Sequence, residues 1–89
     1  MNITELGIII EKTLNINKYE EFPDYYVDFH GVEISESNDN IYKSVTGRGK
    51  TIKSATNDYA RKLRNQTIVI DAFRRSRREF KIPKTLKGF

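Results

Sequence analysis

The residues best suited to chemistry are a run of arginines near the C-terminal end of the chain. Arg74, Arg75, Arg77 and Arg78 place four guanidinium groups within five residues. A guanidinium group is planar and donates paired hydrogen bonds, so it matches the oxygen geometry of a phosphate. Such a run is typical of surfaces that neutralise the phosphates of a nucleic acid. The alternative is a solvated hairpin loop whose arginines pair with acidic residues of the same chain.

The charge of the chain is divided between its two halves. Residues 1–42 hold two basic and nine acidic residues, whereas residues 43–89 hold fourteen basic and three acidic residues. The formal charges are therefore −7 and +11, within a total of +4. A strongly basic half favours an acidic partner, most often nucleic acid. The competing interpretation is that the halves neutralise each other within the fold or across a homodimer.

Further cations flank a predicted helix and would extend the arginine run into one patch. The predicted nucleic-acid site comprises Arg48, Lys50, Lys53, Arg61, Arg64, Arg74, Arg75, Arg77 and Arg78. If exposed, the aromatic rings of Tyr26, Tyr42 and Phe73 are candidates to stack on bases.

Two weaker motifs suggest phosphate or metal chemistry. Gly49-Lys50-Thr51 matches the end of a phosphate-binding loop, but Ser44 stands where the first glycine is required. A glycine loop entering a helix N-terminus can still hold a phosphate through its backbone N–H groups. Asp28 and His30 alternate on a strand, a spacing that suits a divalent metal, although one His and no Cys argue against structural zinc.

A third arrangement is a possible nuclease site. Asp71, Glu79 and Lys81 resemble the two acids and one lysine that hold Mg²⁺ and position water in metal-dependent nucleases. The motif is short, and Asp71 also suits the end of a strand. We therefore expect no catalytic residues, metal or cofactor, and keep the nuclease as a minor alternative.

The elements that must position these residues predict an α+β domain. A capped helix is expected from Asn2 to about Leu14, followed by strands within residues 25–36 and 41–46. The hydrophobic alternation changes phase at Gly31, which predicts a bulge or a tight turn there. Residues 47–50 are predicted as a loop, followed by a helix over about 52–64 with Thr51 as its N-cap and Asn65 as its C-cap. Strands are predicted over 67–73 and 79–82. The expected fold is a small antiparallel sheet with two helices packed on one face, in the order α-β-β(-β)-α-β-β. Residues 1–83 would form this domain and residues 84–89 a flexible tail.

Length and composition exclude several classes of protein. With 89 residues and no Cys, the chain is too short for a large catalytic fold and has no thiol chemistry. The longest apolar run, residues 8–10, is too short to span a bilayer, and no basic region precedes it, so we expect no signal peptide. We expect a cytoplasmic protein with no membrane partner.

Local resemblances accompany the Gly-x-Gly segment. The loop and the helix that follows it resemble the Gly-x-Gly-x-Ser loop and Lys-Lys-x-Ala-Lys helix start of double-stranded RNA-binding domains over about twenty residues. The residues that fall in register are Gly47, Gly49, Thr51, Lys53, Ala55 and Ala60. In this register Ile52 and Thr56 replace two of the three phosphate-contacting lysines of that family. The start of the same helix is also similar to that of HicB-like antitoxin domains, with Ser54 in place of their Glu.

A broader resemblance covers roughly residues 45–83. The Gly-x-Gly-Lys-Thr segment, Asp58-Tyr59-Ala60, the strand from Thr67 to Ala72 and Arg77-Arg78-Glu79 resemble small uncharacterised accessory proteins of phages and prophages of Gram-positive bacteria. That resemblance implies a phage-infected host cytoplasm as the setting and supplies no catalytic residues.

The sequence therefore predicts a small non-enzymatic accessory protein that binds nucleic acid through its basic C-terminal half. The alternative partner is a host protein that the chain inhibits or modulates.

Overall fold

The first helix is shorter than the sequence predicts. In this computed structural model, which describes residues 1–19, 21, 23–36 and 41–88, α1 spans Ile3–Ile10. Asn2 caps it as expected. The Asn2 side chain accepts a hydrogen bond from the Glu5 N–H, and the Glu5 carboxylate accepts one from the Asn2 N–H. Glu11 then adopts a left-handed conformation with φ 58° and ends the helix.

The prediction of helix as far as Leu14 was therefore wrong. Residues 14–18 form strand β1 (Leu14–Lys18) instead. Ile10 and Leu14 continue the helical spacing, which misled the periodicity argument. The alternation of Leu14, Asn15, Ile16 and Asn17 is equally a strand pattern, and pairing with a neighbouring strand decides between the two.

The mixed α+β class is confirmed, but the strands form two antiparallel sheets rather than one. The first has the order β1-β2-β5 and the second β4-β3-β6-β7. The remaining strands are β2 (Tyr25–Phe29), β3 (Val32–Glu36), β4 (Ile41–Lys43), β5 (Gly47–Gly49), β6 (Thr67–Ile70) and β7 (Arg78–Lys81).

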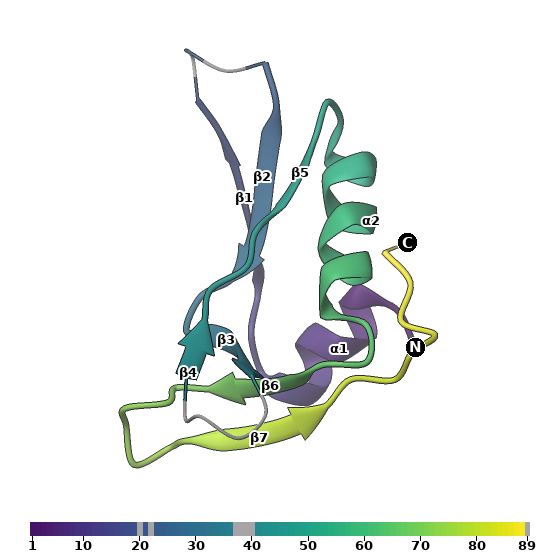
Figure 1. Cartoon of the computed structure of the whole chain (residues 1–89). Helices are drawn as coiled ribbons and strands as arrows, with labels where there is room; N and C mark the ends of the chain where they lie inside the picture. Colours follow the sequence, from purple (N-terminus) through teal and green to yellow (C-terminus); the bar gives the residue numbers. More distant parts are fainter. Residues whose placement is uncertain (20, 22, 37–40, 89) are drawn as a thin grey trace.

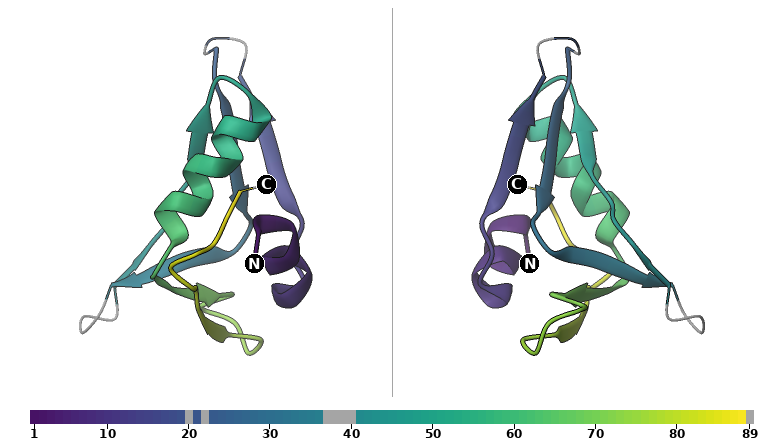
Figure 2. Two further views of the ribbon diagram at one scale, coloured as in Figure 1. Left: turned by 90° about the vertical axis from the view of Figure 1, so that its right-hand side faces the viewer. Right: turned by 90° about the vertical axis from the view of Figure 1, so that its left-hand side faces the viewer.

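A long bent two-stranded ribbon joins the two sheets: β2 and β3 form one of its sides, and β4 and β5 form the other. Val27 pairs with Gly47 in the first sheet, and Ile34 pairs with Lys43 in the second. Between these pairs, residues 28–33 lie on one side of the ribbon and residues 44–46 on the other. The longer side turns sharply at Gly31, whose φ is +73°, as the change of hydrophobic phase there predicted. The ribbon thus contributes two strands to each sheet (Figure 2).

The second helix packs against the first sheet. α2 spans Ile52–Leu63, begins at the predicted cap Thr51 and lies alongside β5 and β2 (Figure 1). Its buried face, which includes Tyr59 and Leu63, meets the apolar side chains of α1 and both sheets in one core. Asn65 follows the helix with φ 62°, in keeping with its predicted place at the helix end.

The C-terminal segment differs from the predicted flexible tail. Leu86 is fully buried in the core, and the Ile3 N–H donates a hydrogen bond to the Lys87 carbonyl at 2.9 Å. The Lys87 N–H in turn donates to the Met1 carbonyl at 3.1 Å. Residues 84–88 therefore return to α1 (Figure 1). In the part of the chain that the structure describes, neither helix is long and apolar enough to cross a membrane.

Candidate nucleic-acid interface

The Gly-x-Gly segment is a strand, not the loop that the sequence predicted. Gly47 and Gly49 lie on the face of β5 that meets α2. A Cβ atom on Gly47 would collide with the Ala55 carbonyl and with the Cβ of Tyr59, and one on Gly49 would lie 2.6 Å from the Ala55 nitrogen. These glycines allow a helix to approach a sheet closely, which explains them without a phosphate.

Arg48 is held on the opposite face of β5. Its Nε donates to the Asp24 carboxylate, and its guanidinium lies 5.6 Å from the ring centroid of Tyr26. The hydrogen bond to Asp24 raises the pKa of Arg48 above its usual value. The Arg48 backbone N–H also donates to Asp58 at 3.0 Å, which ties β5 to α2. Arg48 is thus engaged at several points within the fold.

The cations of α2 differ in how firmly they are held. Arg61 pairs with Asp58, and Arg64 donates through Nε to the Leu86 carbonyl at 2.6 Å. Lys50 and Lys53 are exposed, and no ion pair with another described residue is found for either. We call the set of Arg48, Lys50, Lys53, Arg61 and Arg64 the helix group.

The turn between β6 and β7 presents the arginine run to solvent. Asp71 adopts a left-handed φ of 52°, and two tight turns follow, in which the Arg74 N–H donates to the Asp71 carbonyl and the Arg77 N–H to the Arg74 carbonyl. The Asp71 carboxylate receives Lys12 at 3.2 Å and the Ser76 hydroxyl at 3.4 Å. The hydrogen bond from Lys12 lowers the pKa of Asp71.

Two of the four hairpin arginines are anchored. Arg77 donates to Glu79 at 2.7 Å and to the Tyr42 hydroxyl at 3.1 Å, and these hydrogen bonds raise its pKa. Arg78 donates to the Ile10 carbonyl at 2.7 Å, at the C-terminal end of α1 where a cation is favoured. Arg74 and Arg75 are exposed and make no ion pair with any residue in the described ranges. We call Arg74, Arg75, Arg77 and Arg78 the hairpin group.

An open depression adjoins the hairpin group. It encloses about 500 Å³ beside the turn that follows α1. Its lining residues are Glu11, Lys12, Asp71, Arg75, Ser76, Arg77 and Arg78. Four cations face two carboxylates there, so the depression favours an anion.

The predicted stacking residues lie in two different places. Phe73, on the hairpin, is 87% exposed. Its ring meets that of Tyr42 edge to face, with the two ring centroids 6.1 Å apart. Tyr26 lies on the first sheet, partly covered between Tyr19 and Arg48. Phe73 is therefore the predicted aromatic with the most open surface, and it adjoins Arg74.

The start of the helix group, Lys50 and Lys53, does not form one continuous patch with the hairpin group. The hairpin that carries Arg74–Arg78 lies at the lower end of the molecule in Figure 1, whereas the turn from β5 into α2 lies at the upper end. Both views in Figure 2 show the same separation. A ligand that contacts the hairpin group therefore need not reach Lys50 or Lys53.

The residues of the possible nuclease site are engaged elsewhere. Asp71 holds Lys12, Glu79 holds Arg77, and Lys81 donates to the Asn65 carbonyl at 2.6 Å. Lys81 pairs with Thr67 at the far end of β6 from Asp71. Asp28 accepts a hydrogen bond from Asn15, while His30 is exposed in the turn. Within residues 1–19, 21, 23–36 and 41–88, no three His, Cys, Asp or Glu side chains form a cluster able to hold a metal.

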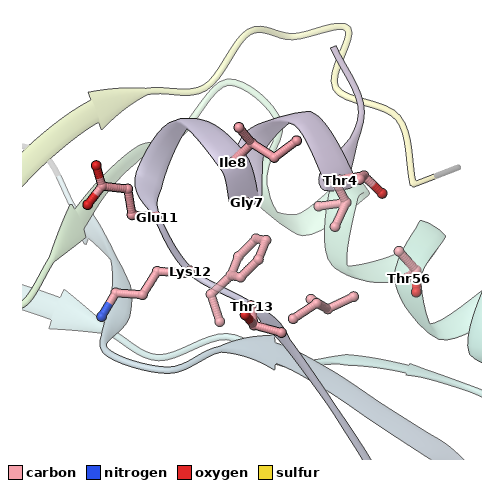
Figure 3. Close-up of a pocket in the computed structure, with 10 residues that line it drawn as sticks. Thr4, Gly7, Ile8, Glu11, Lys12, Thr13 and Thr56 are labelled. Carbon is pink, nitrogen blue, oxygen red and sulfur yellow. The ribbon is translucent and has the colours of Figure 1, made fainter.

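A second cavity, of about 440 Å³, separates α1 from β1 and the start of α2. Ile3, Ile8, Leu14 and Phe29 give it an apolar lining, and Figure 3 shows Thr4, Thr13 and Thr56 at its margin. Sequence reasoning missed this cavity because the helix pattern was extended through Leu14, which left no room for a turn between α1 and β1.

Comparison with other proteins adds no further constraint on the site. No protein-family model, curated protein or solved structure matches the chain.

Proposed function

We propose that the chain is a small non-enzymatic, cytoplasmic accessory protein of phage type that binds nucleic acid through the hairpin group. The observation that carries the proposal is the exposure of Arg74 and Arg75 beside a depression lined by four cations. Arginine forks at this spacing suit successive phosphates, and contacts of this kind supply affinity without reading sequence.

The ion pairs support an external partner over internal neutralisation. Of the five ion pairs found among the described residues, Arg48–Asp24 is the one in which a cation of the basic half meets an acid of the acidic half. Lys12–Asp71 joins the halves with the opposite polarity. Among the described residues, most cations of residues 43–89 therefore make no ion pair, which supports contact with an anionic ligand.

The test is a titration of labelled single- and double-stranded DNA and RNA with two charge-matched variants. Arg74→Ala/Arg75→Ala removes two cations from the hairpin group, and Lys50→Ala/Lys53→Ala removes two from the helix group. All four side chains are exposed, so both variants should fold. The hairpin variant should bind more weakly, with a salt slope reduced by roughly 1.4 to 1.8, as expected for two lost phosphate contacts. The helix variant should bind as the native chain does.

Two results would overturn this proposal. Absence of binding by the native chain to all four ligands at low salt would reject nucleic acid as the partner. Equal weakening by both variants would reject the hairpin as the interface, because net charge alone would then account for binding.

The alternative function, modulation of a host protein, is favoured by a different surface. Ile8 is 74% exposed and Ile9 46% exposed on α1, and Ile8 also borders the 440 Å³ cavity. Exposed apolar side chains beside an apolar cavity are typical of protein contacts.

A second copy of the chain could cover the same surface instead of a host protein. In that case sedimentation should show a dimer that Ile8→Ser dissociates. A monomer at all concentrations would reject that pairing.

A further inference from the structure

The position of Phe73 specifies the kind of nucleic acid that the hairpin suits. Its side chain is 87% exposed, although burial of a phenylalanine side chain is ordinarily favourable. The ring is nevertheless supported: Tyr42 meets it edge to face, with the ring planes 79° apart. Tyr42 is itself held by the hydrogen bond from Arg77. An exposed ring on an anchored neighbour is a surface ready for a flat ligand.

The charges around this ring determine which flat ligand fits. Arg74 and Arg75 follow Phe73 directly in the chain, and Arg77 lies against Tyr42 with its guanidinium 5.9 Å from the ring centroid. An apolar peptide would have to approach through this cationic surface without compensation. A nucleotide offers both a flat base for the ring and a phosphate for the arginines.

Base pairing decides whether the Phe73 ring can reach a base, so the ring distinguishes single strands from duplexes. In a duplex the faces of the bases are stacked on one another, so a protein ring cannot reach them without unstacking. In a single strand the bases are free to stack on aromatic side chains, while the phosphates contact neighbouring cations. Resting on the proposed function, we propose that the hairpin binds single-stranded nucleic acid, with a base stacked on Phe73 and adjacent phosphates on Arg74 and Arg75.

The test compares three substitutions at Phe73 on the full chain. Labelled oligothymidine and oligouridine of about twelve nucleotides, and DNA and RNA duplexes of the same length, are the probes, in keeping with site sizes of single-stranded binders. Phe73→Ala should weaken binding of the single strands by roughly tenfold or more, the usual effect of losing one stacked base. Duplex binding should stay the same, because duplex contacts would involve the arginines alone. Phe73→Tyr should restore the single-strand affinity.

The absence of Trp provides an independent signal. Because the chain contains no Trp, the indole introduced by Phe73→Trp is the only one in the protein. Stacking of a base on that ring should quench its fluorescence when oligothymidine is added, and duplex should leave it unchanged. Thermal unfolding of each variant confirms that the fold is intact, as expected for a side chain so exposed.

The outcomes distinguish this inference from the function on which it rests. Equal affinity of Phe73→Ala and the native chain for single strands, or equal weakening of single strands and duplexes, would overturn the stacking role while leaving nucleic-acid binding in place. Failure of every probe to bind the native chain would overturn both.

Discussion

The Tyr59 hydroxyl accepts a hydrogen bond from the backbone N–H of Phe29 at 3.1 Å. Pairing of β2 with β5 ends at Val27 and Gly47, so this N–H lies where the ribbon leaves one sheet for the other. A side chain of α2 thus supplies the acceptor that a strand no longer provides. Burial raises the pKa of Tyr59 to about 12, which keeps the hydroxyl protonated across the working pH range.

Tyr59→Phe tests this role. The substitution removes the acceptor and leaves a buried N–H without a partner, which should lower the free energy of unfolding by about 1–3 kcal/mol. Urea denaturation of both proteins gives the difference. Tyr19→Phe is the matched control, because Tyr19 is 54% exposed and should tolerate the change. Equal stability of Tyr59→Phe and the native chain would show that the bond contributes nothing.

Gly47→Ala tests the close approach of α2 to β5. The added Cβ would collide with backbone and Cβ atoms of α2, which cannot rotate away. Overpacking of this kind should cost about 1–3 kcal/mol or more, and the thermal midpoint should fall accordingly. Ser44→Ala, at an exposed position of the same ribbon, serves as the control. A midpoint unchanged by Gly47→Ala would contradict the packing described for this strand.

Glu11→Gly should stabilise the protein. Glu11 ends α1 with φ 58°, a conformation that costs a residue with a Cβ roughly 1 kcal/mol and glycine almost nothing. Chemical denaturation should therefore show a gain of about that size. Glu11→Ala removes the same carboxylate but keeps the Cβ, so it should give no such gain. If both variants gain equally, the effect comes from charge rather than from backbone strain.

Asp58 makes the stability of the folded state depend on pH. Burial disfavours its charged form, yet hydrogen bonds from Lys62, the Arg48 N–H and Arg61 lower its pKa from 3.8 to about 2. Ionisation of Asp58 therefore stabilises the folded state. The contribution is complete above about pH 4 and is lost as the pH falls through 2.

The measurement is the free energy of unfolding of the native chain and of Asp58→Asn between pH 2 and pH 7. After allowance for solvent screening, the difference should be about 1 kcal/mol at neutral pH and should shrink toward the acidic end. Lys62→Met should raise the pKa of Asp58 in a carboxyl titration followed by NMR. A difference that is constant with pH would reject the role of the charge.

The parts of the fold that sequence reasoning predicted are those with local signals. Asn2 and Thr51 sit three residues before partners that complete their caps, and Gly31 marks a change of hydrophobic phase. Each signal lies within a few residues of its consequence, so a single sequence contains it. The boundaries of α2 and the turn after Phe29 followed from these signals.

The features that the sequence did not predict depend on distant partners. Leu86 became buried because α1, more than seventy residues away in the chain, accepts the C-terminal segment. Gly47 and Gly49 suggested a phosphate loop because their true partner, the backbone of α2, is visible only in three dimensions. The same limitation applied to the site: the chain order placed all nine cations in one half, whereas the fold puts the turn that carries Lys50 at the opposite end of the molecule from the hairpin that carries Arg74–Arg78.

The ribbon shared by the two sheets links their unfolding. β2 and β3 are joined through Gly31, and their partners β5 and β4 are joined through residues 44–46. Opening of one sheet therefore disrupts the strand pairing of the other. Amide hydrogens of Val27 and Ile34, on opposite sides of the corner, should then exchange with solvent through the same cooperative opening, as one foldon rather than two.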